Sequence, residues 1–255
     1  MCLILFAYRV HPAYRLIVAA NRDEFYGRPT APAQYWADEP DLLAGRDLLK
    51  MGTWMGVTKS GRFAALTNVR DPNEDPSGKR SRGELVADFL KRDVAPGRYM
   101  EQAARARGDY PGYNLLASDG QELYYYSNVG DAPPTRLEPG VYGVSNHLLN
   151  TPWPKVARGR EGLTELLNGN DEQLSERLFD LLRHAEPAPD DSLPRTGVPL
   201  EWERLLSAMY VRSEAHAYGT RTSTVVLMGE GEILFQEKAR PEEGDVVRRY
   251  TIRYR

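Results

Sequence analysis

A short apolar run that ends in four polar side chains constrains the fold of this chain more than any other stretch. Residues 16–20, Leu-Ile-Val-Ala-Ala, have the length and branching of a buried strand. Because side chains alternate along a strand, we expect Asn21 and Asp23 to point to one face and Arg22 and Glu24 to the other. The alternative interpretation is a solvated strand end that carries a local arginine–carboxylate pair.

The only cysteine of the chain heads a second apolar run beside this one. Residues 2–8 read as a buried strand, His11-Pro12-Ala13 as a turn, and residues 14–20 as the antiparallel partner. Such a hairpin sets Cys2 beside the polar cluster. A single cysteine excludes an internal disulfide and any CxxC metal or redox site. Cys2 is therefore either a small hydrophobe or a nucleophile, and we expect no metal site.

The order of the remaining elements indicates an α+β domain of antiparallel sheets with helices on their outer faces. We expect a loop from Arg28 to about Asp47, because Arg28-Pro29-Thr30-Ala31-Pro32 does not suit regular structure. Ser81-Arg82-Gly83-Glu84 has the pattern of a capping box that opens a helix through Leu90. Further helices are expected at residues 97–106, 155–167, 171–184 and 201–210, and further strands at 53–57, 62–68, 113–118, 122–127, 140–146, 219–227, 232–237 and 246–254.

Composition narrows the class of protein. The chain has 255 residues and a formal net charge of −3, with no basic block that would favour nucleic acid. No apolar run approaches the roughly 20 residues of a membrane helix, and no lysine or arginine precedes the first run as in a signal peptide. We expect a single domain over residues 1–255, located in the cytoplasm, without membrane insertion. The sequence does not indicate an oligomeric state.

Five short blocks carry a resemblance to a known family. Met1-Cys2-Leu3-Ile4, Asn21-Arg22-Asp23-Glu24-Phe25 with Arg28-Pro29, Ala65-Leu66-Thr67-Asn68, Gly143-Val144-Ser145-Asn146 and Gly219-Thr220-Arg221-Thr222-Ser223 resemble the NRDE family, which includes the transport and Golgi organisation protein 2 relatives. More distantly, the chain is similar to the choloylglycine hydrolase and penicillin V acylase branch of the N-terminal-nucleophile (Ntn) hydrolases. The resemblance implies a four-layer αββα sandwich of two antiparallel sheets.

The residues also allow acyl-transfer chemistry. If Met1 is removed, Cys2 carries a thiol and an α-amino group of pKa ~7.7–8.0, so one residue supplies nucleophile and base. Asp23 would hold the ammonium and Arg22 would favour the thiolate, which predicts a reactive thiol. Asn68 and Asn146 fit as oxyanion donors, and Arg221 closes the charge network. Asn21, Glu24, Trp54, His147 and Trp153 are the candidate substrate-binding residues.

The sequence leaves open which pair of polar residues faces Cys2. The acylase branch shows Arg-x-x-Asp after its second strand. Here Asn21 and Glu24 have that spacing, whereas Arg22 and Asp23 are the arginine and the aspartate but are adjacent. Either pair could therefore face Cys2.

Three functions follow from this pattern. The first is an Ntn hydrolase that cuts the C–N bond of a small acyl amide through Cys2, with no cofactor required. The second is a catalytically silent binding protein for haem or a fatty-acyl ligand, with His147 or His216 as candidate haem ligands. The third is an interaction scaffold.

Overall fold

The structure is a computed structural model that describes residues 2–169, 171–240 and 246–254. The chain divides into two compact units, and each is described by itself. The first consists of Met1–Gly27, Arg70–Pro72 and Pro139–Ile252, and the second of Arg28–Val69, Asn73–Glu138 and Arg253–Arg255. The expectation of a single domain over the whole chain stays a prediction.

A seven-stranded sheet forms the centre of the first unit. Its main order is β10-β1-β2-β12-β13-β14, and β11 pairs with β12 at the side of this path. The central strands β1 and β2 form the predicted hairpin, with Cys2 opposite Arg22 and Tyr8 opposite Leu16. The strands are β1 (Cys2–Tyr8), β2 (Leu16–Phe25), β10 (Gly140–Val144), β11 (Arg212–Ser213), β12 (Tyr218–Met228), β13 (Glu232–Ala239) and β14 (Val247–Arg253).

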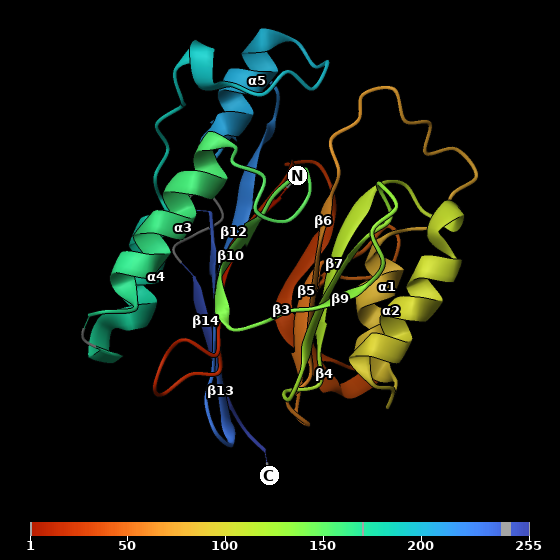
Figure 1. Cartoon of the computed structure of the whole chain (residues 1–255), viewed down its shortest axis with the longest axis vertical. Coiled ribbons are helices and arrows are strands. Elements are labelled where there is room, and N and C mark those ends of the chain that lie inside the picture. The colour runs from red at the N-terminus through yellow and green to blue at the C-terminus, as the bar shows by residue number, and fades with distance from the viewer. Residues whose placement is uncertain (1, 170, 241–245, 255) are drawn as a thin grey trace. The chain divides into compact units, whose positions relative to one another are not determined.

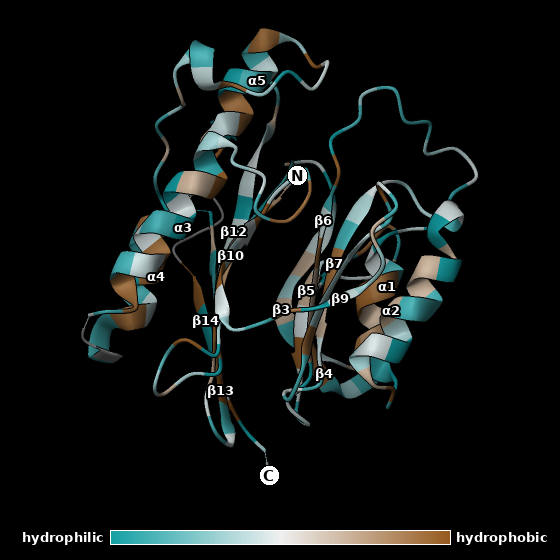
Figure 2. Cartoon of the chain, in the orientation of Figure 1, coloured by the Kyte–Doolittle hydropathy of each residue, from teal (hydrophilic) through white to brown (hydrophobic). Residues whose placement is uncertain are grey.

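Helices α3 (Pro154–Leu166) and α4 (Leu174–Leu182) cover one face of this sheet (Figure 1). Apolar and polar residues alternate along both helices, as expected where one side of a helix faces a core (Figure 2). The core on this face joins Leu3, Leu5, Ile17 and Ala19 of the hairpin to the two helices. Helix α5 (Leu200–Ser207) packs Leu206 beside Val211 and Tyr218 in a smaller cluster. Short 3₁₀ turns lie at η2 (Asp171–Gln173) and η3 (Asp190–Ser192).

The second unit has its own seven-stranded sheet, in the order β3-β4-β5-β6-β7-β8-β9. Helices α1 (Gly83–Lys91) and α2 (Pro96–Arg105) pack on it through Phe89, Tyr99 and Met100, and η1 (Arg107–Asp109) follows α2. The strands are β3 (Thr30–Trp36), β4 (Glu39–Asp47), β5 (Met55–Thr58), β6 (Phe63–Asn68), β7 (Tyr113–Ser118), β8 (Leu123–Ser127) and β9 (Thr135–Arg136).

The predicted loop from Arg28 to Asp47 is wrong, because β3 and β4 form a hairpin there. Strand β3 contains Pro32, which cannot donate a ladder hydrogen bond. It is tolerated because β3 is an edge strand whose register shifts between Ala31 and Gln34. The prolines therefore mark the sheet edge rather than the end of regular structure.

The predicted capping box is also wrong. Helix α1 begins at Gly83 with Arg82 as its N-cap, and within the described residues no side chain caps this end. Glu84 instead forms an ion pair with Arg80, with 2.9 Å between the guanidinium nitrogen and the carboxylate oxygen. The Ser81 carbonyl oxygen accepts a hydrogen bond from the Glu84 backbone N–H, so a backbone turn replaces the side-chain cap.

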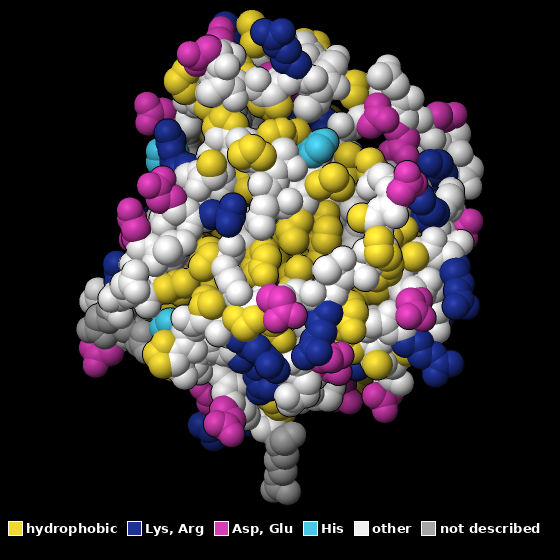
Figure 3. All heavy atoms as spheres, viewed as in Figure 1, with side chains coloured by type: hydrophobic (Ala, Val, Ile, Leu, Met, Phe, Trp, Pro, Cys, Tyr) yellow, Lys and Arg dark blue, Asp and Glu magenta, His cyan; other side chains and the backbone are white. Residues whose placement is uncertain are grey.

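The other expected elements are confirmed, with ends that shift by a few residues. In the described part of the chain, no helix combines the length and the apolar character that a membrane span needs. On the face drawn in Figure 3, acidic and basic side chains are interspersed rather than gathered by sign. This agrees with the small net charge of −3.

Candidate active site

Four neighbouring strands of the first unit bring predicted site residues together. Cys2 at the start of β1 pairs with Arg22 on β2, which in turn pairs with Thr222 on β12. On the other side, the β1–β10 register pairs Ile4 with Val144, and continuing it by two residues sets Asn146 beside Cys2. The hydroxyl oxygen of Ser145 lies 2.8 Å from the carbonyl oxygen of Cys2, which ties these two strand ends together.

The register also shows which polar pair shares a face with Cys2. Residues opposite each other in a ladder point to the same side, so Cys2 and Arg22 share the face turned away from α3 and α4. Glu24 points to that side too, and its carboxylate lies 3.6 Å from the Arg22 guanidinium. Asn21 and Asp23 point to the helix-covered face. The pair beside Cys2 is therefore Arg22–Glu24, neither of the two pairs that the sequence left open.

Asn21 is fully buried on the helix face and bonds to protein groups. Its Nδ2 donates to the backbone oxygens of Leu182 at 2.9 Å and Met209 at 2.8 Å. Its Oδ1 accepts from the Ser223 hydroxyl at 2.6 Å. These bonds tie β2 to the end of α4 and to β12. The structure thus gives Asn21 a bracing contact, and its predicted role in substrate binding stays untested.

Asp23 is 1% exposed and accepts a 2.7 Å hydrogen bond from the Thr220 hydroxyl. Burial raises the pKa of its carboxyl above the ordinary value, and the nearby cations Lys155 and Arg22 oppose that rise. Its charge in the fold therefore depends on these cations.

Cys2 is also buried, with 7% of its surface exposed. Burial raises the pKa of its thiol, and the negative charge of Asp23 adds to the rise. Arg22 and the backbone N–H of Asp23, which donates toward the sulfur, oppose it. The net direction is opposite to the reactive thiolate expected from Arg22 alone. Attack by this thiol therefore needs a base to take its proton in the reaction.

Cys2 and Arg22 form a row of neighbouring residues across β1 and β2, and Asn146 and Arg221 lie at its two sides. Asn146 is fully buried, and the Ser145 hydroxyl lies 3.1 Å from its Oδ1, which orients the amide. Arg221 falls where the β2–β12 register shifts, as the extra residue of a bulge. Its guanidinium donates to the backbone oxygens of Phe25 at 3.2 Å and Tyr26 at 3.1 Å, and so braces the exit of β2.

Charged residues that the sequence did not indicate surround the row. Arg70 and Glu203 form a buried ion pair, with 2.5 Å between nitrogen and oxygen. The Arg70 backbone N–H donates to the Asn146 carbonyl oxygen at 2.8 Å. Lys155 is 2% exposed, and burial lowers the pKa of its ammonium to about 8. The sequence did contain a signal for Lys155. It follows the Pro152-Trp153-Pro154 block, in the first turn of a helix, and helix N-termini disfavour cations, so a lysine there is unusual.

The aromatic and histidine candidates have ordinary partners in the first unit. Trp153 is half-buried, with the Arg70 guanidinium 4.7 Å from its ring centroid and the His147 ring at 5.7 Å. His147 is exposed, and its Nδ1 lies 2.9 Å from the Thr151 hydroxyl oxygen. The His216 ring lies 4.7 Å from the Trp202 ring, centroid to centroid, and is tilted by 57° to it. Haem ligation by either histidine stays a prediction.

Asn68 and Trp54 belong to the second unit. Asn68 ends β6 opposite Tyr113, and the Trp54 carbonyl oxygen accepts from the Leu66 backbone N–H at 2.8 Å. Their predicted association with Cys2 stays a prediction. Met1 lies outside the described residues, so its removal also stays a prediction.

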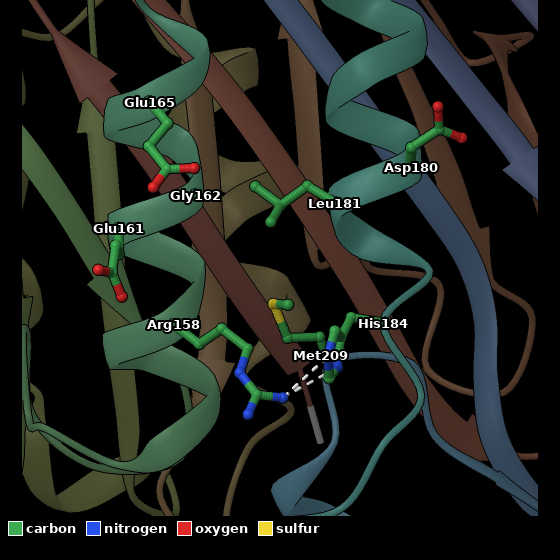
Figure 4. A pocket seen from close by; sticks show the side chains of 8 residues that line it. All are labelled: Arg158, Glu161, Gly162, Glu165, Asp180, Leu181, His184 and Met209. Atoms are coloured by element: carbon green, nitrogen blue, oxygen red, sulfur yellow. Dashed lines mark hydrogen bonds between the residues drawn. The ribbon is translucent and has the colours of Figure 1, made fainter.

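A depression of about 220 Å³ lies between α3 and α4. Figure 4 shows Arg158 reaching the His184 ring, and their nitrogens approach to 2.8 Å. Its lining holds none of the predicted site residues. It consists of Arg158, Glu161, Gly162, Glu165, Asp180, Leu181, His184 and Met209.

Comparison with solved structures defines the class of fold. The chain is similar to the Caenorhabditis elegans N-acylethanolamine-hydrolyzing acid amidase ortholog, with a TM-score of 0.54 and 12% identity over 89% of this chain and 92% of that one. The fold is that of the Ntn hydrolases, which confirms the predicted α+β class.

Sequence comparison then gives the family. The family model described as Transport and Golgi organisation 2 matches residues 1–241. The human Transport and Golgi organization protein 2 homolog is 37% identical, over 94% of this chain and 93% of the relative. The mouse homolog is 36% identical with the same coverage, and the Drosophila melanogaster protein is 33% identical over 93% and 92%. The chain belongs to the Transport and Golgi organisation 2 family, which confirms the predicted resemblance.

Proposed function

We propose that this protein is an Ntn amidohydrolase that cuts the C–N bond of a small acyl amide through Cys2. The observation that carries the proposal is the position of the only cysteine. Cys2 begins a buried central strand, between Asn146 on one side and Arg22 on the other. The proposed cellular location is the cytoplasm, where a lone thiol stays reduced.

The proposed reaction has two steps. After Met1 is removed, the Cys2 sulfur attacks the amide carbon, and the thiol proton passes to the α-amino group and then to the leaving amine. The C–N bond breaks and a thioester remains. Water then attacks the thioester, the C–S bond breaks, and the acid is released with the thiol restored. Asn146 would donate to the oxyanion of each step.

The neighbouring buried charges give the other roles. Asp23 would hold the α-ammonium group, and Arg22 would oppose the rise in the thiol pKa that burial causes. Neither group needs to take a proton itself. The name of the Caenorhabditis elegans relative indicates an N-acylethanolamine as a first substrate class to try.

The test compares processed wild type with Cys2→Ala on long-chain N-acylethanolamines and other acyl amides. Intact mass first establishes the loss of Met1 in each protein. We expect amine release by wild type and at least a roughly 1000-fold lower rate in Cys2→Ala, because the covalent step is lost. Ser192→Ala serves as the control, because this exposed serine of η3 bonds to the Pro189 carbonyl oxygen and to none of the proposed site residues. Equal release by wild type and Cys2→Ala would refute the proposal.

A binding protein for a fatty-acyl ligand or haem is the second candidate. It is favoured by the burial of Cys2 and the raised pKa of its thiol, which suit a silent site. Such a site contains the ligand with few polar contacts, so Cys2→Ala would leave its affinity unchanged. Titration of haem and of a fatty-acyl ligand into both proteins separates the two candidates.

A further inference from the structure

Lys155 lies in a position that is unfavourable for a cation. It occupies the first turn of α3, directly after Pro154, where the helix end carries partial positive charge. Its side chain is 2% exposed, and its Nζ has no hydrogen-bond partner among residues 2–169, 171–240 and 246–254. A buried ammonium of this kind is strongly destabilising unless negative charge compensates it.

The compensating charge lies on β2, a strand of the sheet whose face α3 helps to cover. Asp23 on β2 points to the helix-covered face and is 1% exposed. The negative charge of Asp23 favours the ammonium form of Lys155, as the thiolate form of Cys2 would, whereas the cation of Arg70 disfavours it. For Asp23, Lys155 contributes the largest effect that opposes burial. Lys155 and Asp23 therefore depend on each other for their charged forms.

We propose that Lys155 is a positioning residue for Cys2: its buried ammonium keeps Asp23 a carboxylate, and Asp23 in turn holds the α-amino group of the processed cysteine. The first half stands on the burial of Lys155 and Asp23 on the same face of the sheet, where one core joins Val156 of α3 to residues of β1 and β2. The second half rests on the proposed function.

Other charged groups near Asp23 do not replace Lys155. Arg22 points to the opposite face of the sheet and forms an ion pair with Glu24. Arg70 forms a buried ion pair with Glu203. Tyr218 is neutral, because burial and the nearby negative charges raise its pKa well above the ordinary value. Among the described side chains, Lys155 is thus the cation with the largest effect on the Asp23 carboxylate.

The test is a carboxyl NMR titration of protein labelled with [γ-¹³C]aspartate. The Asp23 signal is identified by its loss in Asp23→Asn. We expect Lys155→Met to raise the Asp23 midpoint by about one pH unit or more, as for removal of a nearby opposite charge. Lys155→Arg should keep the wild-type midpoint. Lys238→Met, which removes a cation paired with Glu176, should also leave it unchanged.

An unchanged Asp23 midpoint in folded Lys155→Met would overturn the proposal. If Lys155→Met does not fold, the same coupling is measured from the other side with [ε-¹³C]lysine. Because linkage is reciprocal, Asp23→Asn should lower the Lys155 midpoint below its wild-type position. An unchanged Lys155 midpoint would overturn the proposal equally.

A rate measurement separates this proposal from the proposed function. If the protein hydrolyses an amide, Lys155→Met should shift the acid limb of the rate–pH profile upward, and Lys155→Arg should restore it. An unshifted acid limb would overturn the second half of the proposal. Absence of hydrolysis together with the NMR shift would refute the proposed function and leave the charge coupling standing.

Discussion

Burial moves the pKa values of Cys2 and Lys155 in opposite directions, because it disfavours the charged form of each. The Cys2 thiol becomes harder to ionise and the Lys155 ammonium easier to deprotonate. Asp23 lies near both residues and links their titrations. At the scale of single residues, the Cys2 thiol therefore stays protonated until a base removes its proton.

The first prediction concerns the two charges nearest the thiol. Arg22→Gln should raise the pH midpoint of Cys2 alkylation, because it removes a cation that favours the thiolate. Asp23→Asn should lower the midpoint, because it removes an opposing anion. Iodoacetamide rates followed by intact mass from pH 6 to ~10.5 measure both. Arg9→Gln, beyond the other end of β1, is the control, and shifts of the same sign in both variants would contradict the account.

The second prediction tests the bracing contacts of Asn21. Asn21→Ala removes two hydrogen bonds to buried backbone oxygens and one from Ser223. Unsatisfied buried acceptors cost ~1–3 kcal/mol each, so we expect the free energy of unfolding to fall by about 3 kcal/mol. Urea denaturation measures it, with Glu24→Gln as the control on the other face of β2. A loss below ~1 kcal/mol would contradict a bracing role.

At the scale of elements, the close approach of α3 to β1 positions the start of β1. Gly159 on α3 allows this approach, since a Cβ there would lie 2.6 Å from the Leu5 Cδ1 atom and 2.7 Å from Cδ2. Leu5 is fully buried in the core between sheet and helices, so neither methyl group has room to move.

The third prediction follows from this contact. Gly159→Ala should lower the free energy of unfolding by ~1–3 kcal/mol, even though alanine favours a helix, because overpacking dominates. Gly108→Ala is the matched control, since a Cβ there meets nothing within 4 Å. Thermal and urea denaturation of both variants measure the difference. Equal or greater stability of Gly159→Ala would show that α3 can move away from β1.

What the sequence could predict differs between elements for physical reasons. The β1–β2 hairpin was predictable because two apolar runs flank a turn, and its register then set Arg22 opposite Cys2. Strand β3 was missed because a proline is excluded only from central strands, and edge position is not visible in the sequence. The Arg70–Glu203 ion pair and the electrostatic effect of Asp23 on Lys155 each link distant segments, and only tertiary packing brings these residues together.

At the scale of the whole molecule, buried charges make folding stability depend on pH. The chain carries a net charge of only −3, so long-range repulsion contributes little. The pKa of Lys155 falls from 10.5 in the unfolded chain to about 8 in the fold. Between these values the unfolded chain binds more protons than the folded one, so stability rises with pH.

The fourth prediction isolates this effect. The free energy of unfolding of wild type, minus that of Lys155→Met, should rise between about pH 8 and pH 10.5 by up to ~3 kcal/mol, at about 1.4 kcal/mol per pH unit. The subtraction removes groups that titrate alike in both proteins. Urea denaturation at a series of pH values measures it. A flat difference curve would mean that folding does not lower the pKa of Lys155.

The central claim is that Cys2 forms a covalent acyl intermediate. Intact-mass spectrometry tests it most directly, because one spectrum reports both the loss of Met1 and any acyl group on the protein. Wild type and Cys2→Ala are mixed with an N-acylethanolamine and quenched in acid within seconds. The account predicts a mass gain of one acyl group, with loss of one water relative to the acid, on processed wild type and none on Cys2→Ala. Processed wild type that binds the amide, gains no mass and releases no amine would contradict it.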